Sequence, residues 1–196
     1  MTKRRSQADL FPQILKEARA GFGGACTARS NPTSRRPFAR RTPMHLVLRS
    51  DLAKGSRSLL LKDSEIRNIL AQESARVGAK ALDLANVGNH LHLVMTFPSA
   101  VAMSHFLRAF SGRVARAVLD AKKGRGRLSM GTRFWAGRPF SRIVGWGGPL
   151  KTLTRYVQIN RQESLGQKRG SARKLLSQLE ELGLVCFGAR SFQSSA

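Results

Sequence analysis

The alternation of apolar and polar residues divides the middle of the chain into short strands and amphipathic helices. Apolar runs at 44–48 and 90–97 end in polar or turn residues and are typical of buried strands. A weaker alternation at 80–87 is followed by a Gly-Asn turn and predicts a hairpin with the second run. Apolar residues at helical spacing predict helices over 64–77 and over about 100–120.

Shorter elements follow in the last third of the chain. Charge and glycine predict an exposed basic loop at 122–127. Two candidate short strands lie at 133–135 and 140–144. A helix is expected over about 148–163, with a proline in the first turn, where its missing N–H is tolerated. Leucines at helical spacing predict a last helix that ends at Gly183.

This order of elements predicts the fold class. A strand, a helix and a hairpin followed by a second helix form the split βαβ arrangement, in which one antiparallel-rich sheet is covered by helices. We therefore expect an α+β domain with a ferredoxin-like sheet and helices on one face. The other face of the sheet would be open to a ligand.

The two ends of the chain differ in composition from this domain. Residues 1–42 carry two Arg pairs among glycines and prolines and predict a flexible basic N-terminal arm, with a short helix near Leu10–Ala20. The domain itself is expected at 43–166. A C-terminal helix and tail follow at 167–196.

The charge of the chain is strongly one-sided. Its 196 residues include 35 Lys and Arg against 11 Asp and Glu, a formal net charge of +24. So much positive charge repels itself unless a polyanion screens it, so nucleic acid is the expected partner.

No apolar run is long enough for a membrane span and no secretory signal is visible, so we expect the protein in the cytoplasm. Cys26 and Cys186 are too far apart in sequence to predict a metal knuckle or a disulfide framework.

His90 and His92 are candidate metal ligands. They are two positions apart on an expected strand, so both imidazoles project from one face, with Cα atoms about 6.6 Å apart, and can hold one metal ion. The simpler interpretation is two histidines on a half-exposed strand without a ligand. Leu91, Leu93 and Met95 favour the metal site, because these apolar residues take the face that the helices cover.

The only tyrosine of the chain, Tyr156, lies on the helix expected at 148–163. Asn160 follows one turn later on the same face, so a phenol and an amide oxygen can both point at the histidine pair. Packing of Tyr156 in the core is the alternative. Two imidazoles and an amide oxygen leave open positions on a divalent ion, which can polarise a phosphodiester. A phenol can hold a phosphoryl group covalently, and a cation such as Arg155 would favour its phenolate, so we expect phosphoryl transfer on DNA or RNA.

The segment Asn89-His90-Leu91-His92 and the apolar strand after it resemble the His-hydrophobe-His motif of the IS200-like single-tyrosine transposases. The resemblance is closest to the REP-associated tyrosine transposases, in which the tyrosine lies downstream on a helix. It covers about residues 43–166, and Phe134–Val144 is similar to the Trp-containing segment that precedes the tyrosine helix in that family.

The resemblance implies a mechanism as well as a fold. In the family, two histidines and an amide residue one turn after the tyrosine hold Mg²⁺ or Mn²⁺, roles that fall on His90, His92 and Asn160. Tyr156 would be the nucleophile. The implied activity is cleavage of single-stranded DNA beside a hairpin, giving a 5′-phosphotyrosine and a free 3′-hydroxyl, followed by rejoining, in the cytoplasm of a bacterium and on its nucleoid.

Some positions depart from the pattern of that family. Gly88 stands where a proline usually precedes the Asn-His pair, and Asn160-Arg161 stands where Asn-Pro usually follows the tyrosine. Relaxases usually show a third histidine and an upstream tyrosine, and rolling-circle initiators a lysine one turn after the tyrosine, so neither class fits. Val94 excludes a histidine-triad hydrolase, which needs a third alternating histidine.

Basic and aromatic residues supply the expected DNA contacts. Several are expected to surround the ligand face or its adjoining loop, and Trp135 and Phe140 can each stack an unpaired base or pack in the core. The candidates are Asn89, Arg108, Arg113, Lys122, Lys123, Arg125, Arg127, Arg133, Trp135, Arg138, Arg142 and Arg155.

Three functional hypotheses follow. The first is a metal-dependent transposase that acts on single-stranded hairpin DNA, as a monomer or a homodimer. The second is a catalytically inactive hairpin-DNA-binding or regulatory protein of the same fold. The third, an RNA-binding protein, is disfavoured because the exposed strand carries histidines where such sheets carry stacking aromatics.

Overall fold

The computed structural model describes residues 22–23, 36–120 and 133–182. Its strands are β1 (Phe22–Gly23), β2 (Met44–Arg49), β3 (Lys80–Asn86), β4 (His90–Thr96) and β5 (Phe140–Ile143). Its helices are α3 (Asp63–Val77), α4 (Ala100–Val118), α5 (Gly148–Ser164) and α6 (Arg169–Glu181), with two 3-10 turns, η1 (Gly55–Arg57) and η2 (Leu59–Lys62). The helices and strands expected at 44–48, 64–77, 80–87, 90–97, 100–120, 140–144 and 148–163 are confirmed to within three residues.

The strands form one antiparallel sheet in the order β1-β5-β2-β4-β3. Helix α3 connects β2 to β3 and helix α4 connects β4 to β5, so β4 lies between the two strands that α3 joins. This is the βαββαβ order of a split βαβ sheet, and it confirms the predicted α+β, ferredoxin-like class.

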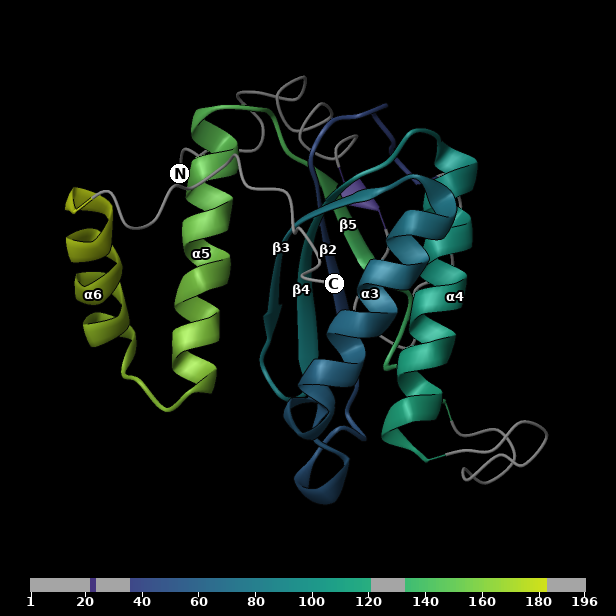
Figure 1. Cartoon of the computed structure of the whole chain (residues 1–196), viewed down its shortest axis with the longest axis horizontal. Coiled ribbons are helices and arrows are strands. Elements are labelled where there is room, and N and C mark those ends of the chain that lie inside the picture. Colours follow the sequence, from purple (N-terminus) through teal and green to yellow (C-terminus); the bar gives the residue numbers. More distant parts are fainter. Residues whose placement is uncertain (1–21, 24–35, 121–132, 183–196) are drawn as a thin grey trace, which may run out of the picture.

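One face of the sheet forms the main core. On β2, Leu46 lies opposite Leu93 of β4, and Leu48 lies opposite Leu91, all of them fully buried. Helices α3 and α4 lie side by side over this face (Figure 1). Phe106 of α4 is the centre of an aromatic stack within this core, between two further phenylalanines.

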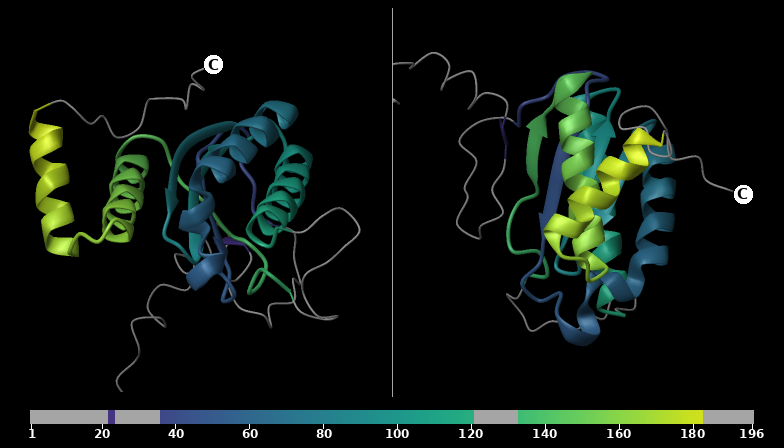
Figure 2. Two further views of the ribbon diagram at one scale, coloured as in Figure 1. Left: turned by 60° about the horizontal axis from the view of Figure 1, so that its bottom comes forward. Right: turned by 90° about the vertical axis from the view of Figure 1, so that its left-hand side faces the viewer.

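The opposite face also carries a helix, the one whose Tyr156 and Asn160 are expected to point at the histidine pair. Helix α5 packs on β3 and β4 through Ala85, Val94, Leu150 and Val157, which form a second buried cluster. Helix α6 then packs on the outer side of α5, and Figure 2 shows the layers α6, α5, sheet and α3 with α4 in that order. The pair of helices on one face is confirmed, but the expectation that the other face stays open is corrected, because α5 covers part of it.

The strand expected at 133–135 does not form. Backbone and side-chain groups there bond to other segments: Ser50 Oγ donates to the Phe134 carbonyl, and Trp135 Nε1 donates to the Ser111 carbonyl of α4 at 2.9 Å. The N–H of Ala136 bonds to the Arg49 carbonyl at 2.9 Å. The Phe134 carbonyl is thus bonded to a side chain and Ala136 to a single residue of β2, so the described residues show no strand ladder at 133–135.

Part of the predicted N-terminal arm belongs to the sheet, because Phe22 and Gly23 pair with β5. Arg36 donates to Ser141 Oγ of β5 at 2.9 Å and holds the following segment to the same edge. The expected short helix at 10–20 and basic loop at 122–127 lie outside the described residues. Among the residues that are described, no helix combines the length and apolar character needed to cross a lipid bilayer.

Replacing Phe106 by alanine tests the main core. The ring is fully buried between Phe97 and Phe110, at centroid distances of 5.4 and 5.2 Å, so its removal leaves a cavity among rigid neighbours. We expect Phe106→Ala to lower the free energy of unfolding by about 3–5 kcal/mol in urea titrations. The matched control Val101→Ala, on the exposed side of the same helix, should change it by less than about 0.5 kcal/mol.

Candidate functional site

The site is built on the sheet face that α5 partly covers. His90 and His92 of β4 share this face as predicted, with ring centroids 4.7 Å apart. A third histidine, His45 of β2, joins them: its ring lies nearly parallel to that of His92 with centroids 5.2 Å apart. His45 Nε2 and His92 Nδ1 are 3.0 Å apart and share a hydrogen bond.

Sequence reasoning missed His45. The residue lies 47 positions before His92 in an apolar run, and nothing local links it to the His90–His92 motif. The antiparallel register supplies the link, because His45 is the partner of Val94 and is therefore a diagonal neighbour of His92 on the same face. The available signal is the period of two along a strand, which puts His45 on the face opposite Met44, Leu46 and Leu48.

The second ring nitrogen of each β4 histidine is free for a ligand. His90 Nδ1 lies 2.7 Å from Asn89 Oδ1, and because a carbonyl oxygen only accepts, His90 Nδ1 donates and Nε2 keeps its lone pair. His92 Nε2 is buried and has no hydrogen-bond partner in the described part of the chain. A buried polar atom without a partner fits a missing ligand such as a metal ion.

Burial keeps these imidazoles neutral. It lowers the pKa of His92 to about 3, with the neighbouring His45 and His90 adding to the effect. It lowers the pKa of His45 to about 4, with a contribution from the Arg142 guanidinium, and it also lowers the pKa of His90, next to Arg49. Neutral imidazole is the form that binds metal, so the ligands need no deprotonation near neutral pH.

Tyr156 of α5 stands over the histidines. Its ring is 5.5 Å from that of His92 and 6.4 Å from that of His45, in both cases edge to face. The residue is 39% exposed, so the phenol combines contact with the histidine cluster and access from solvent. The sole tyrosine is therefore not a core residue.

Asn160 lies one turn after Tyr156 and is buried. Its Nδ2 donates to the Tyr156 carbonyl at 2.7 Å, which fixes the amide and leaves Oδ1 as its remaining acceptor. Across residues 22–23, 36–120 and 133–182, no group of three or more His, Cys, Asp or Glu side chains is arranged to hold a metal ion. The two imidazoles of β4 and this amide oxygen stay the predicted metal ligands.

Polar contacts on both sides of α5 help to fix its position. On its inner side, Gln158 Nε2 donates to both carboxylate oxygens of buried Asp83, at 2.9 Å each. Burial raises the pKa of Asp83, and the bond from Gln158 acts in the opposite direction. On its outer side, Arg155 bonds to Ser177 and forms an ion pair of 3.7 Å with Glu180 of α6.

A cavity of about 500 Å³ opens beside Tyr156. His45 and Arg142 line its sheet side, and Pro149, Thr152 and Leu153 line its helix side. Its wall is therefore apolar with a cation at one side, next to the phenol.

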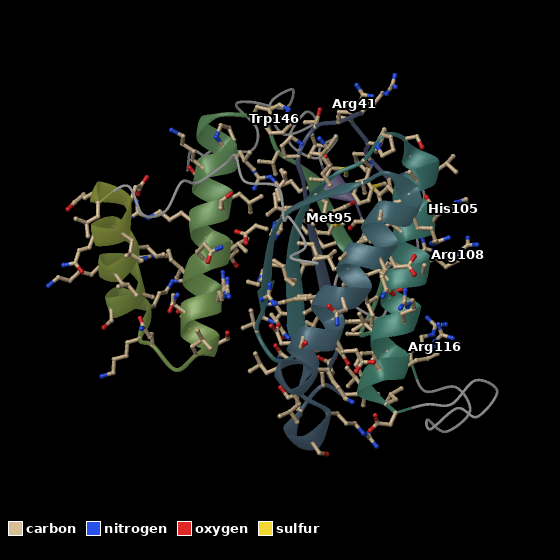
Figure 3. The ribbon with its side chains drawn as sticks, in the orientation of Figure 1. Arg41, Met95, His105, Arg108, Arg116 and Trp146 are labelled. Atoms are coloured by element: carbon tan, nitrogen blue, oxygen red, sulfur yellow. The ribbon has the colours of Figure 1, made fainter. Side chains whose placement is uncertain are left out.

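An exposed aromatic residue lies three positions before Pro149, one of the cavity residues, in the sequence. Trp146, which the sequence analysis did not single out, belongs to the loop between β5 and α5, and Figure 3 shows it near the start of α5. Phe140, a predicted base-stacking candidate, has its ring 6.3 Å from that of His45. Phe140 is therefore an aromatic neighbour of His45, and Trp146 is an exposed aromatic in the loop that leads into α5.

Several predicted DNA contacts lie elsewhere. Arg108 and Arg113 are on α4, on the side of the sheet away from α5 (Figure 3), and Arg113 forms an ion pair of 2.8 Å with Glu73. Trp135 packs against α4, and Arg155 faces α6, so neither surrounds the histidines and Arg155 is not the cation beside the phenol. Arg108 and Arg113 lie away from the histidines because α4 packs on the other face of the sheet, whereas Arg155 lies on the side of α5 that faces α6.

The remaining candidates divide into three groups. Arg142 lies on the histidine face and lines the cavity, and Asn89 bonds to His90. Arg133 and Arg138 are exposed in the segment before β5. Lys122, Lys123, Arg125 and Arg127 lie outside the described residues.

A comparison with protein families identifies the family to which the chain belongs. A family model described as "Transposase IS200 like" matches residues 41–160, a segment that begins before His45 and ends at Asn160. The chain belongs to the IS200-like transposase family. Membership makes it a DNA-binding transposase, which agrees with its net charge of +24. A comparison with curated proteins found no match for the chain.

The transposase should lose stability in mild acid because of its buried histidines. The folded pKa values of His45 and His92 are about 4 and about 3, below the usual value, so between there and about pH 6.5 the unfolded chain binds protons that the folded chain does not. Stability therefore falls as pH decreases, by about 1 kcal/mol per pH unit for each imidazole. Urea unfolding between about pH 7 and about pH 5, with a chelator, should show a flatter slope for the double variant His45→Phe/His92→Phe; equal slopes would contradict this.

The link between Asp83 and Gln158 gives a second prediction. Gln158→Met keeps the length of the side chain but removes the amide, so the buried carboxylate loses a hydrogen-bond donor. We expect a decrease of about 1–3 kcal/mol in the free energy of unfolding. Gln178→Met, on the exposed side of α6, is the matched control and should leave stability unchanged; the same loss in both variants would refute a specific role for the link.

Proposed function

We propose that this transposase is a metal-dependent endonuclease and strand-transferase that cleaves single-stranded DNA at hairpin-associated sites through a 5′-phosphotyrosine on Tyr156. The observation that carries the proposal is the position of the only tyrosine, with its ring 5.5 Å from a buried histidine whose Nε2 has no partner among the described residues. The preference for hairpins rests on the resemblance to the REP-associated transposases.

The phenol performs the covalent step. Tyr156 Oη attacks the scissile phosphorus, its proton passes to solvent, and the bond between phosphorus and the 3′ oxygen breaks. The departing oxygen takes up a proton and becomes a free 3′-hydroxyl, while the 5′ phosphate stays on the tyrosine. Attack of a 3′-hydroxyl on the phosphotyrosine reverses the step and rejoins DNA, and no nucleotide hydrolysis is needed because the number of phosphodiester bonds is conserved.

His90, His92 and Asn160 would hold Mg²⁺ or Mn²⁺. When bound, the ion polarises the phosphodiester and stabilises charge on the departing oxygen. The ligand set fits, because both imidazoles are neutral, neither Nε2 has a hydrogen bond within the described residues, and Asn160 offers an amide oxygen. All three ligands are uncharged, so they would not neutralise a bound ion, and its positive charge would act on the phosphate.

The surroundings support a single-stranded DNA substrate. Arg142 places a cation in the cavity beside the phenol, and Arg133 and Arg138 are exposed on the segment before β5. Exposed Trp146 and half-buried Phe140 supply aromatic faces near the site, which stack on unpaired bases but not on bases within a duplex.

The test is adduct formation with labelled single-stranded hairpin DNA carrying randomised flanks. Wild type with Mn²⁺ should form a covalent protein–DNA species on denaturing gels. Tyr156→Phe should form none, because the attacking oxygen is missing, and chelation of the metal should also abolish it. Tyr156→Phe should still bind the hairpin at wild-type affinity at the same salt concentration, which is the control for folding.

Two results would contradict the proposal. A persisting adduct in Tyr156→Phe would place the nucleophile elsewhere. Salt-resistant, metal-independent hairpin binding by wild type without any adduct would indicate the inactive DNA-binding or regulatory protein instead.

A further inference from the structure

We infer that His45 is a positioning residue for the metal site: it accepts a hydrogen bond from His92 Nδ1–H and thereby holds His92 in the tautomer whose Nε2 lone pair can bind the ion. The inference rests on the proposed function, since it concerns the same metal site. It assigns a role to a residue outside the His90–His92 motif.

The backbone holds the two rings in place. β2 and β4 are adjacent strands, and the register that pairs His45 with Val94 and His92 with Val47 makes the imidazoles diagonal neighbours on one face. The residues are 8% and 4% exposed, and the rings are inclined by only 15° to each other. With so little exposure, water has little access to take the place of either partner in the 3.0 Å hydrogen bond.

The proton in this hydrogen bond has two possible positions. If His45 Nε2 donates, neutral His92 carries its proton on Nε2, where the described residues offer no acceptor, and a buried unpaired N–H results. If His92 Nδ1 donates, Nε2 is a bare lone pair. Only the second arrangement allows the buried nitrogen to bind a cation, and binding then satisfies the ring nitrogen of His92 that has no partner in the described part of the chain.

The neighbouring ligand is held by the same means. Asn89 Oδ1 accepts from His90 Nδ1 at 2.7 Å and leaves His90 Nε2 free. Both ligands thus use Nδ1 for a hydrogen bond and keep Nε2 for the metal, one through the turn before β4 and the other through the adjacent strand. Asn89 and His45 are independent partners with the same effect. This indicates that the structure maintains, on each β4 histidine, the tautomer with a bare Nε2.

Two other roles for His45 are less compatible with the geometry. A lone pair on Nε2 that accepts from His92 cannot at the same time bind a metal ion, so His45 is not a third ligand through this nitrogen. A purely packing role would be satisfied by any planar ring, because the two rings are nearly parallel and meet edge to edge. Substitutions that keep the ring or keep the acceptor separate these roles.

The experiment compares Mn²⁺ affinity without DNA, by electron paramagnetic resonance of the free ion. His45→Phe keeps the ring and removes the acceptor, and we expect roughly 10–100-fold weaker binding. His45→Gln restores an acceptor and should return affinity to within a few-fold of wild type. His105→Phe is the matched control, since His105 is exposed on α4 far from the site (Figure 3), and it should bind as wild type does.

Nuclear magnetic resonance of the metal-free wild type, labelled with ¹⁵N-histidine, reads the tautomer directly. We expect a protonated Nδ1 and a bare Nε2 on His92, and a larger share of the Nε2–H form in His45→Phe. Wild-type Mn²⁺ affinity in His45→Phe, a protonated His92 Nε2 in wild type, or three imidazoles coupled to bound Mn²⁺ would each overturn the inference. Thermal unfolding of each variant shows whether a loss of affinity comes from loss of folding.

These outcomes are distinct from failure of the proposed function. If wild type shows the expected His92 tautomer but binds no Mn²⁺ and forms no DNA adduct, the proposed metal chemistry fails and the role of His45 in selecting the tautomer stands. If wild type binds Mn²⁺ and forms the adduct while His45→Phe matches it in both, only the inference about His45 fails.

Discussion

The antiparallel pairing of β2 with β4 is the contact on which the rest of this protein depends. Its register places Leu46 against Leu93 on one face and His45 diagonally beside His92 on the other. Because side chains alternate along a strand, a slip by one residue would turn the imidazoles into the core and the leucines toward α5. Burial of the leucines beneath α3 and α4 therefore fixes the geometry of the histidine site.

The helix that carries Tyr156 is held to the sheet by different forces on its two sides. A small apolar cluster and the bond from Gln158 to Asp83 attach its inner side, and α6 covers its outer side through Arg155. Polar contacts with directional hydrogen bonds fix the rotation of a helix more closely than apolar contact does, since apolar packing is not directional. The placement of the phenol over His92 thus follows from these contacts.

The protein combines many basic residues with a cluster of neutral histidines, and this combination suits its proposed chemistry. Basic residues give the chain its net charge of +24, while burial keeps the clustered histidines neutral. A polyanion is attracted over the surface, and the cluster itself offers lone pairs to a cation rather than more positive charge. Of the predicted basic contacts, Arg142 lies at this site, whereas Arg113 is paired with Glu73 behind the sheet.

Sequence patterns were sufficient to predict the α+β order of elements, the shared face of His90 and His92, and the position of Asn160 one helical turn after Tyr156. Each follows from a period of two or 3.6 residues within one element, so local spacing is sufficient. Tertiary contacts were needed to show that His45 meets His92, how much of the histidine face α5 covers, and that the segment at 133–135 forms no strand. These depend on strand register and helix docking between residues far apart in the chain, which local periodicity does not encode.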